Sequence, residues 1–151
     1  EIVEHPADKD ATDTELALAE AAARGATSVT VVSGGGDRPD HVFALLHSVA
    51  DPALARVRID GWLGRSRFLV LRAVDSADMP AVAGDTVSLL PVGGDATVTA
   101  TGLKWPLQQS VLRATQSRGI SNVALGAPHV QVHSGSLIVF ITPSDEGDTH
   151  P

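Results

Sequence analysis

The segment TSVTVVSGGGDRPDHVFALLHSV, residues 27–49, carries the pattern that decides the fold. Its start is rich in β-branched residues and runs into a series of glycines, which predicts a strand over residues 27–32 followed by a tight loop. Pro39 then suits the first turn of a helix, where the missing N–H costs nothing. The apolar residues after it recur at helical spacing and predict a buried stripe: Val42, Phe43, Leu45, Leu46 and Val49. The segment therefore predicts a strand, a glycine loop and a helix in direct succession.

The residues on either side extend this unit into an alternation of strands and helices. Upstream, apolar residues at helical spacing followed by Gly25 predict a helix over residues 13–24, and the opening EIVEH predicts a short strand. Downstream, ARVRID (55–60) predicts a third strand. The alternation predicts a parallel βαβαβ unit, part of a three-layer α/β domain. Since three strands in about 60 residues bury little surface, we expect the N-terminal half of this domain to precede Glu1.

The pattern changes after Gly61. Short apolar runs then follow one another, separated by glycine, proline, aspartate and serine, without a helical period of any length. The runs are RFLVLRAV, DTVSLLPV, ATVTATGL, HVQVHS and SLIVFI. They predict an antiparallel sandwich or barrel of roughly five to seven strands. We therefore expect an α/β part at residues 1–62, a β-sandwich at residues 63–143 and a disordered polar tail at residues 144–151.

Composition excludes several classes of function. The net charge of −7 argues against a nucleic-acid partner, because phosphate backbones select clustered lysine and arginine. The chain has no cysteine, which excludes disulfides and thiolate metal sites. Its longest apolar runs, such as LIVFI, are too short to cross a bilayer. We expect a cytoplasmic protein with neither a nucleic-acid nor a membrane partner.

An acidic cluster lies at the start of the first expected helix, in KDATDTELAL. Thr12 and Glu15 fit the T-x-x-E capping box, which places Asp13 in the first turn and Asp10 just before the helix. This start lies at the carboxyl end of the expected strand EIVEH, the edge where open α/β sheets bind ligands. Two carboxylates there suit Mg²⁺, and Lys9 adds a charge for phosphate. The alternative is that the acids only stabilise the helix N-terminus through its macrodipole.

The glycine loop offers a second group of candidates. Its backbone N–H groups, at Gly35 and Gly36, could cradle a phosphate at the start of the following helix. Arg38 offers a fork for phosphate, Asp40 a third carboxylate on the same sheet edge, and His41 a further donor. The alternative is a tight turn between strand and helix in which Arg38 and Asp40 form a local ion pair.

These motifs resemble those of the thiamine pyrophosphokinase (thiamine diphosphokinase) family. KDATDTELAL is similar to that family's K/Q-D-x-T-D helix start, and GGGDRPDH to its glycine-rich R-x-D-H/Q loop. GDTVSLLPVGGDATVTATGLKWPL followed by SRGISN resembles the family's C-terminal domain in order and spacing. The resemblance runs from about Pro6 to Ile141. Several linked motifs in one order are specific, whereas any one alone is weak.

The resemblance implies a two-domain homodimer. An α/β domain binds ATP and Mg²⁺, and a β-sandwich helps to bind thiamine near the dimer interface. The implied reaction moves pyrophosphate from ATP to the thiamine hydroxyl and releases AMP. It depends on positioning and charge neutralisation more than on covalent help from the protein.

The resemblance also implies roles for particular residues. Asp13, supported by Asp10, matches the metal-associated acid, and with Asp40 these are the candidate catalytic carboxylates. The candidate ATP-binding residues are Lys9, Thr12, Gly35, Gly36, Arg38, Asp40 and His41. The candidate thiamine-binding residues are Lys9, Trp105, Ser121 and Asn122.

Two points stay open in the sequence. Trp105 could stack on a ring of thiamine through cation–π attraction, or it could pack in the sandwich or dimer core. The family's further acidic motifs, of D-G-G and G-D-F-D-S type, are not found in this sequence, which leaves the metal site short of ligands and the activity of this piece alone open. The alternative function is a non-catalytic module that binds a small ligand or a partner and derives from the same family.

Overall fold

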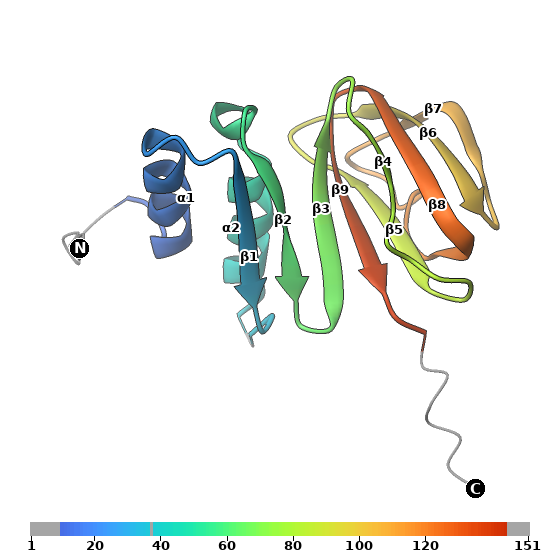
Figure 1. Ribbon diagram of the computed structural model, residues 1–151, viewed down its shortest axis with the longest axis horizontal. Coiled ribbons are helices and arrows are strands. Elements are labelled where there is room, and N and C mark those ends of the chain that lie inside the picture. The colour runs from blue at the N-terminus through green and yellow to red at the C-terminus, as the bar shows by residue number, and fades with distance from the viewer. Residues whose placement is uncertain (1–9, 37, 145–151) are drawn as a thin grey trace, which may run out of the picture.

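The computed structural model describes residues 10–36 and 38–144 (Figure 1). The first half contains helix α1 (Asp13–Ala23), strand β1 (Ser28–Ser33), helix α2 (Pro39–Val49), the short 3-10 helix η1 (Pro52–Leu54) and strand β2 (Arg58–Leu63). The second half contains seven strands: β3 (Ser66–Arg72), β4 (Ser76–Asp78), β5 (Thr86–Pro91), β6 (Ala96–Leu103), β7 (Leu107–Leu112), β8 (Asn122–Ser134) and β9 (Ser136–Thr142). The expected strand EIVEH lies outside the described residues.

Local capping explains where the two helices begin and end. The hydroxyl of Thr12 accepts a hydrogen bond from the backbone N–H of Glu15 at 3.2 Å, as the capping-box pattern predicts. Gly25, with φ 83°, follows the C-cap of α1 and donates to the carbonyl of Ala22 at 2.9 Å. Helix α2 begins at Pro39, which needs no N–H partner in the first turn. Both helices therefore begin where the sequence pattern places them.

The strands form one mixed sheet that is parallel at one end and antiparallel elsewhere. β1 and β2 pair in parallel, with Ser28 opposite Arg58 and Ser33 opposite Leu63. The strand order is β1-β2-β3-β9-β5-β8-β6-β7, and β4 pairs with β8 beside this path. The described pairs after β1 and β2 are all antiparallel, and the sheet does not close into a barrel. This confirms the expected fold class, a partial α/β unit followed by an antiparallel sandwich.

Two hydrophobic cores share strand β9. The core under the helices contains Leu18, Leu45, Val49, Leu54, Val57, Ile59, Phe68, Val70 and Ile138. The sandwich core includes Leu137, Val139 and Ile141 from the same strand. Because β9 is buried on both faces, its sequence SLIVFI is an unbroken apolar run rather than an alternation. β9 thus joins the α/β half to the sandwich.

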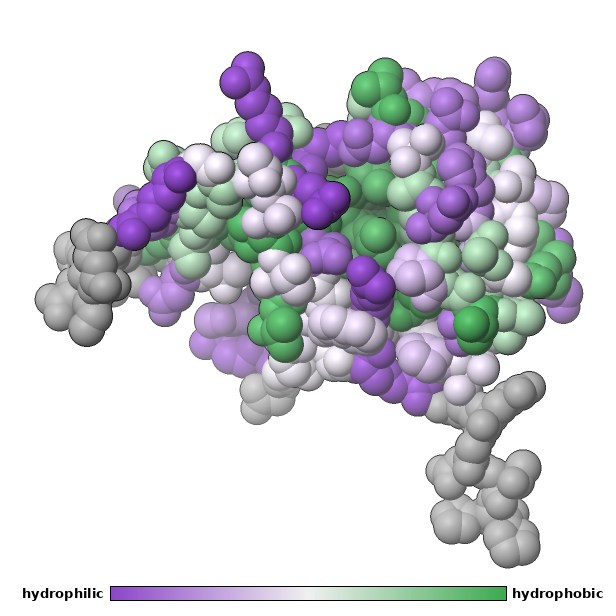
Figure 2. All heavy atoms as spheres, in the orientation of Figure 1, coloured by the Kyte–Doolittle hydropathy of each residue, from purple (hydrophilic) through white to green (hydrophobic). Residues whose placement is uncertain are grey.

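The helices cover one face of the β1–β2 pair. Val29 and Val31 pack against the core under the helices, whereas Val32 is 76% exposed. Figure 1 shows α2 behind these two strands, so the view looks onto the uncovered face. On the same side of the molecule, but beyond the β1–β2 pair, Figure 2 shows a hollow with a hydrophobic floor, bordered by hydrophilic side chains. Among the described residues, α1 and α2 have 11 residues each, and neither could span a bilayer.

Several expectations need correction. The third strand begins at Arg58 rather than at residue 55, because Asp51 caps η1 by accepting from the N–H of Ala53 at 2.8 Å. Phe43 does not belong to the buried stripe of α2: it is 65% exposed and its ring lies 4.5 Å from that of His47. β4, β7 and the first half of β8 were not predicted, because none of them has a long alternating apolar run.

Candidate functional site

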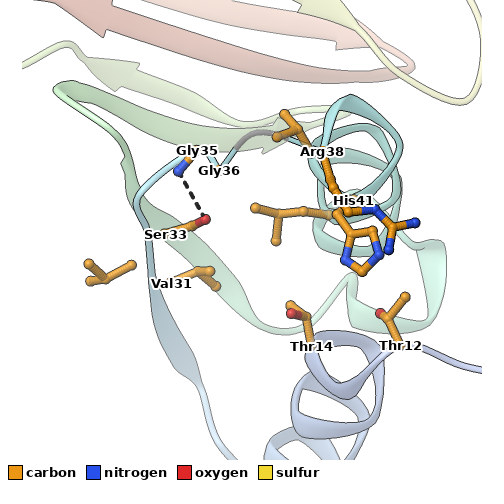
Figure 3. A pocket seen from close by; sticks show the side chains of 11 residues that line it. Thr12, Thr14, Val31, Ser33, Gly35, Gly36, Arg38 and His41 are labelled. Carbon is orange, nitrogen blue, oxygen red and sulfur yellow. Dashed lines mark hydrogen bonds between the residues drawn. The ribbon is translucent and has the colours of Figure 1, made fainter.

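A cavity of about 410 Å³ opens at the carboxyl end of β1 (Figure 3). Its lining comes from the start of α1, the end of β1, the glycine loop and the start of α2. The lining residues are Thr12, Thr14, Val31, Val32, Ser33, Gly35, Gly36, Arg38, His41, Val42 and Leu45. Five of these were candidates from the sequence, namely Thr12, Gly35, Gly36, Arg38 and His41. Thr14 and Ser33 were missed, although Thr14 directly follows the candidate Asp13 and Ser33 lies two residues before the candidate Gly35.

The glycine loop takes a backbone path that side chains oppose. Gly35 has φ 88° and Gly36 has φ 54°, a region that residues with a Cβ rarely adopt. The N–H of Gly35 donates to the hydroxyl of Ser33 at 3.3 Å, and the N–H of Gly64 donates to the carbonyl of Ser33 at 2.8 Å. These bonds tie the loop to the end of β2 and turn the chain from β1 toward α2.

Two helix N-termini meet at this cavity. Thr12 and Thr14 come from the start of α1, and Arg38 and His41 come from the start of α2. Figure 3 shows these four side chains lying around one space beside the glycine loop. A helix N-terminus carries partial positive charge and unpaired N–H groups, so it attracts anions. The arrangement therefore suits a phosphate group.

Arg38 and Asp40 form a local ion pair at the mouth of α2. The guanidinium contacts the carboxylate twice, Nη2 to Oδ2 at 2.5 Å and Nε to Oδ1 at 3.3 Å. The hydrogen bond from Arg38 holds the pKa of the Asp40 carboxyl below its ordinary value, and the same bond raises the pKa of Arg38. Both side chains are exposed. This local ion pair was the alternative interpretation of the motif. Arg38 does line the cavity, but its Nε and Nη2 groups are already bonded to Asp40.

The candidate metal ligands do not gather at the cavity. Asp10 and Asp13 are exposed at the start of α1, and neither they nor Asp40 line the cavity. Within residues 10–36 and 38–144, no three histidine or acidic side chains lie close enough to hold a metal ion. Lys9 lies outside the described residues. The described residues by themselves therefore do not fit a complete magnesium site.

The thiamine-side candidates form a separate group in the sandwich. Trp105 is 55% exposed, and the ammonium of Lys104 lies 4.8 Å from the centre of its ring. Asn122 is only 8% exposed. Its carbonyl oxygen accepts from the backbone N–H groups of Trp105 and Val123, at 3.1 and 2.9 Å, and its amide donates to the carbonyl of Trp105 at 2.7 Å. Asn122 thus fixes the backbone that presents Trp105.

Ser121 lies next to this group in an uncommon conformation. It has φ 58°, and its backbone N–H donates to the hydroxyl of Ser88 at 3.0 Å. Figure 1 shows β6 and β7, which flank Trp105, at the opposite end of the molecule from α1. The lining of the glycine-loop cavity includes none of Trp105, Ser121 and Asn122. The two candidate groups are therefore well separated within one chain.

The chain therefore consists of an α/β unit followed by an antiparallel sandwich, and the α/β unit carries a pocket suited to binding an anion. Two family models match it: "Thiamin pyrophosphokinase, catalytic domain" over residues 1–59 and "Thiamin pyrophosphokinase, vitamin B1 binding domain" over residues 75–139. Together they span both halves of the sequence, and the chain belongs to the thiamine pyrophosphokinase family. No curated protein matches the sequence.

Solved structures of the same family share the fold. The thiamine pyrophosphokinase of Bacillus subtilis aligns with a TM-score of 0.77 at 22% identity, over 92% of this chain and 65% of that one. A family protein from Enterococcus faecalis gives 0.75 at 23% identity, over 95% and 68%. The enzyme of Geobacillus thermodenitrificans gives 0.70 at 25% identity, over 93% and 66%. The chain thus spans about two thirds of the length of these structures.

Proposed function

We propose that the intact protein transfers the β,γ-pyrophosphoryl group of ATP to the hydroxyl of thiamine, giving thiamine diphosphate and AMP. The observation that carries this proposal is a glycine-loop pocket between two helix N-termini, in a chain that matches both the catalytic and the vitamin B1 binding models. The proposal concerns the intact protein, because the chain spans only about two thirds of the solved structures it resembles, 65% of the first of them.

We assign the phosphates of ATP to the glycine-loop cavity. Gly36 would offer a backbone N–H group, and Gly35 would add its own by giving up the 3.3 Å hydrogen bond to the Ser33 hydroxyl. Thr12 and His41 would offer side-chain donors. Arg38 would bind a phosphate through its fork. Its present partner, Asp40, competes for the same N–H groups, so ATP must either displace the carboxylate or share the guanidinium with it. Lys9 is proposed to lie near both substrates.

The reaction itself needs one bond to form and one to break. The thiamine hydroxyl oxygen attacks the β-phosphorus, the bond from that phosphorus to the oxygen bridging the α-phosphate breaks, and AMP leaves. The hydroxyl proton passes to a base, for which Asp13, Asp10 and Asp40 are the candidates. Positioning of the two substrates and stabilisation of the phosphate charge together supply most of the acceleration in such transfers.

We propose that ATP binds together with Mg²⁺. This ion commonly takes one or two protein carboxylates and completes its shell with phosphate oxygens and water. Asp10 and Asp13 are the proposed carboxylates. These two carboxylates would hold the ion together with the phosphates, and the chemistry it would supply is neutralisation of phosphate charge.

We propose that thiamine binds beside Trp105, with Ser121 and Asn122 around it. The exposed indole offers a face for a cationic or flat ring. The carbonyl oxygen and the amide of Asn122 already form hydrogen bonds with the backbone of Trp105 and Val123. Its main role would therefore be to position Trp105. Because this group lies far from the glycine loop in one chain, a homodimer that brings the two groups together from different subunits is part of the proposal.

Formation of AMP tests the proposed function. The intact protein is incubated with ATP and Mg²⁺, with and without thiamine, and AMP is measured. We expect AMP to form only when thiamine is present, and thiamine diphosphate to form in equal amount. If no AMP forms when thiamine is added, but AMP forms with another small alcohol, thiamine is the wrong substrate. Absence of AMP under all conditions, with both ligands bound, would favour the non-catalytic module.

A further inference from the structure

A second cavity lies at the opposite end of the parallel strands β1 and β2, where both strands begin. It measures about 340 Å³, and its lining is Thr27, Ala55, Arg56, Val57, Arg58, Val70, Leu71, Arg72, Asp75, Ser76 and Ala77. Thr27 precedes β1 and Arg58 begins β2, whereas the glycine-loop cavity lies at the other end of these strands. Six residues of strand separate the two ends by about 20 Å. The second cavity is therefore distinct from the proposed ATP pocket.

Three arginines surround this cavity. They are three of only eleven basic residues in a chain whose net charge is −7. The side chains of Arg56 and Arg58 are exposed, and neither has a hydrogen bond or an ion pair within the described ranges. Asp75 is the single acidic residue in the lining. The lining of the cavity therefore carries three arginines against one carboxylate, which gives it a net positive charge.

Arg72 forms the fixed part of this group. Its Nη2 donates to the carbonyl of Val49 at 3.1 Å, which anchors the end of β3 to the end of α2. The carboxylate of Asp75 accepts from the backbone N–H of Arg72 at 2.8 Å rather than from its guanidinium. Nε of Arg72 is buried without a partner among the described residues. Burial lowers the pKa of Arg72 although Asp75 and Asp51 oppose the shift, so its charge is poorly solvated here.

The turn at the rim of the cavity is strained. Val74 has φ 71°, which is an outlier for a β-branched residue, and its side chain is 87% exposed. Hydrogen bonds hold the turn on both sides, from the N–H of Val74 to Val132 at 2.9 Å and from the N–H of Asp75 to Arg72 at 2.8 Å. Strain of this kind persists where the surroundings over-determine it, and it is frequent at ligand sites.

We infer that this cavity binds a small phosphate-bearing anion. Guanidinium groups bind phosphate oxygens through paired N–H groups, and the hydroxyls of Thr27 and Ser76 add further donors. The volume lies at the lower end of the range for small-molecule sites, which suits an anion the size of phosphate or pyrophosphate. The lining draws on both family matches, residues 1–59 and 75–139, so the anion links the α/β half to the sandwich.

Titration with inorganic phosphate and pyrophosphate tests this site. The intact protein is followed through its backbone amide NMR signals at constant ionic strength, with citrate as a carboxylate comparison. We expect pyrophosphate to shift the amides of Thr27, Arg58 and Ser76. The double variant Arg56→Gln/Arg58→Gln should weaken this binding by about tenfold or more. The matched control is Arg113→Gln/Arg118→Gln, which removes two exposed arginines of the β7–β8 connection and should leave the affinity unchanged.

A further variant separates the two cavities. Arg38→Gln weakens anion binding at the glycine loop and should leave the shifts at Thr27 and Ser76 intact. Three results would overturn the inference: unchanged affinity in the Arg56/Arg58 variant, shifts confined to Gly35 and Gly36, or citrate binding as tightly as pyrophosphate. None of these results depends on whether thiamine is the substrate, so this test is separate from the AMP assay.

Discussion

Arg38 and Asp40 join across the first turn of α2 at two points, Nη2 to Oδ2 at 2.5 Å and Nε to Oδ1 at 3.3 Å. A phosphate group takes a guanidinium through the same pair of N–H groups. The carboxylate therefore occupies the place that a nucleotide phosphate would use, at the mouth of the glycine-loop cavity. Arg38 is the arginine that lines this cavity, so its replacement should weaken ATP binding more than the replacement of any other lining residue.

Replacing Arg38 tests its role in holding ATP. Arg38→Gln should raise the Kd for ATP by about tenfold or more, because a charge-assisted contact to phosphate is lost. Calorimetric titration of the intact protein measures this value. Arg24→Gln is the matched control, because it breaks a similarly exposed ion pair, with Glu20, at the far end of α1. Equal effects of the two changes would mean that Arg38 acts only through overall charge.

The ion pair also predicts a pH dependence. The pKa of Asp40 is lowered in the folded chain, so its stabilising effect is present above the ordinary value of 3.8 and is lost as pH falls through the lowered pKa. The contribution to stability is small because the pair is exposed. The carboxyl carbon signal of Asp40 gives its pKa directly. In Arg38→Gln this pKa should rise toward 3.8, and an unchanged value would contradict the pair.

Adjacent glycines give a second matched comparison. Gly35 has φ 88°, whereas Gly34 lacks a positive φ and a Cβ there would meet nothing within 4 Å. Gly35→Ala should destabilise the fold by about 1–2 kcal/mol and weaken ATP binding, because the loop must leave its path. Gly34→Ala should change both only slightly. Urea unfolding and ATP titration measure the two effects, and equal sensitivity at both positions would contradict the assigned loop geometry.

Trp105 and Asn122 should differ in what their loss affects. Asn122→Ala leaves the backbone groups of Trp105 unpaired, so we expect a loss of about 1–3 kcal/mol in unfolding free energy, and a higher KM for thiamine. Trp105→Ala removes a half-exposed side chain, so stability should change little. Because the proposed contact is with thiamine, the KM for thiamine should rise more than the KM for ATP. Equal rises in both KM values for Trp105→Ala would indicate packing instead of thiamine contact.

Asp13 separates the metal hypothesis from the capping alternative. Asp13→Ala should abolish turnover in the intact protein while circular dichroism and the unfolding midpoint stay close to those of the wild type. A carboxylate that only stabilises the start of α1 would instead cost about 0.3–1 kcal/mol and leave turnover in place. AMP formation with thiamine therefore distinguishes the two.

The fold was largely predictable because its elements carry local signals. Thr12 and Pro39 mark helix starts, and the β-branched run before the glycine loop marks β1. β7 and the first half of β8 were not predicted, because neither has an alternating apolar pattern of its own. β7 pairs with β6, the strand directly before it, and the first half of β8 pairs with β5 and with the end of β6. The exposure of Phe43 was also hidden, since spacing defines a helix face without showing how much of it is covered.

The candidate site was predictable to a smaller extent. Chain proximity brings Gly35, Gly36, Arg38 and His41 to one cavity, and the start of α1 adds Thr12. Sequence spacing does not fix where a carboxylate at a helix start points, so the roles of Asp10, Asp13 and Asp40 stay predictions. The structural work of Asn122 was not visible either, because it depends on a contact with a backbone 17 residues away.

Whether the glycine-loop cavity holds the phosphates of ATP is tested most directly by mapping the amide NMR shifts that ATP causes in the intact protein. If the glycine-loop cavity holds the phosphates, the largest shifts fall on Gly35, Gly36 and the first turn of α2, and Arg38→Gln reduces them. If they fall instead on Thr27, Arg58 and Ser76, with Gly35 and Gly36 unmoved, ATP binds at the other end of the strands and the assigned pocket is wrong.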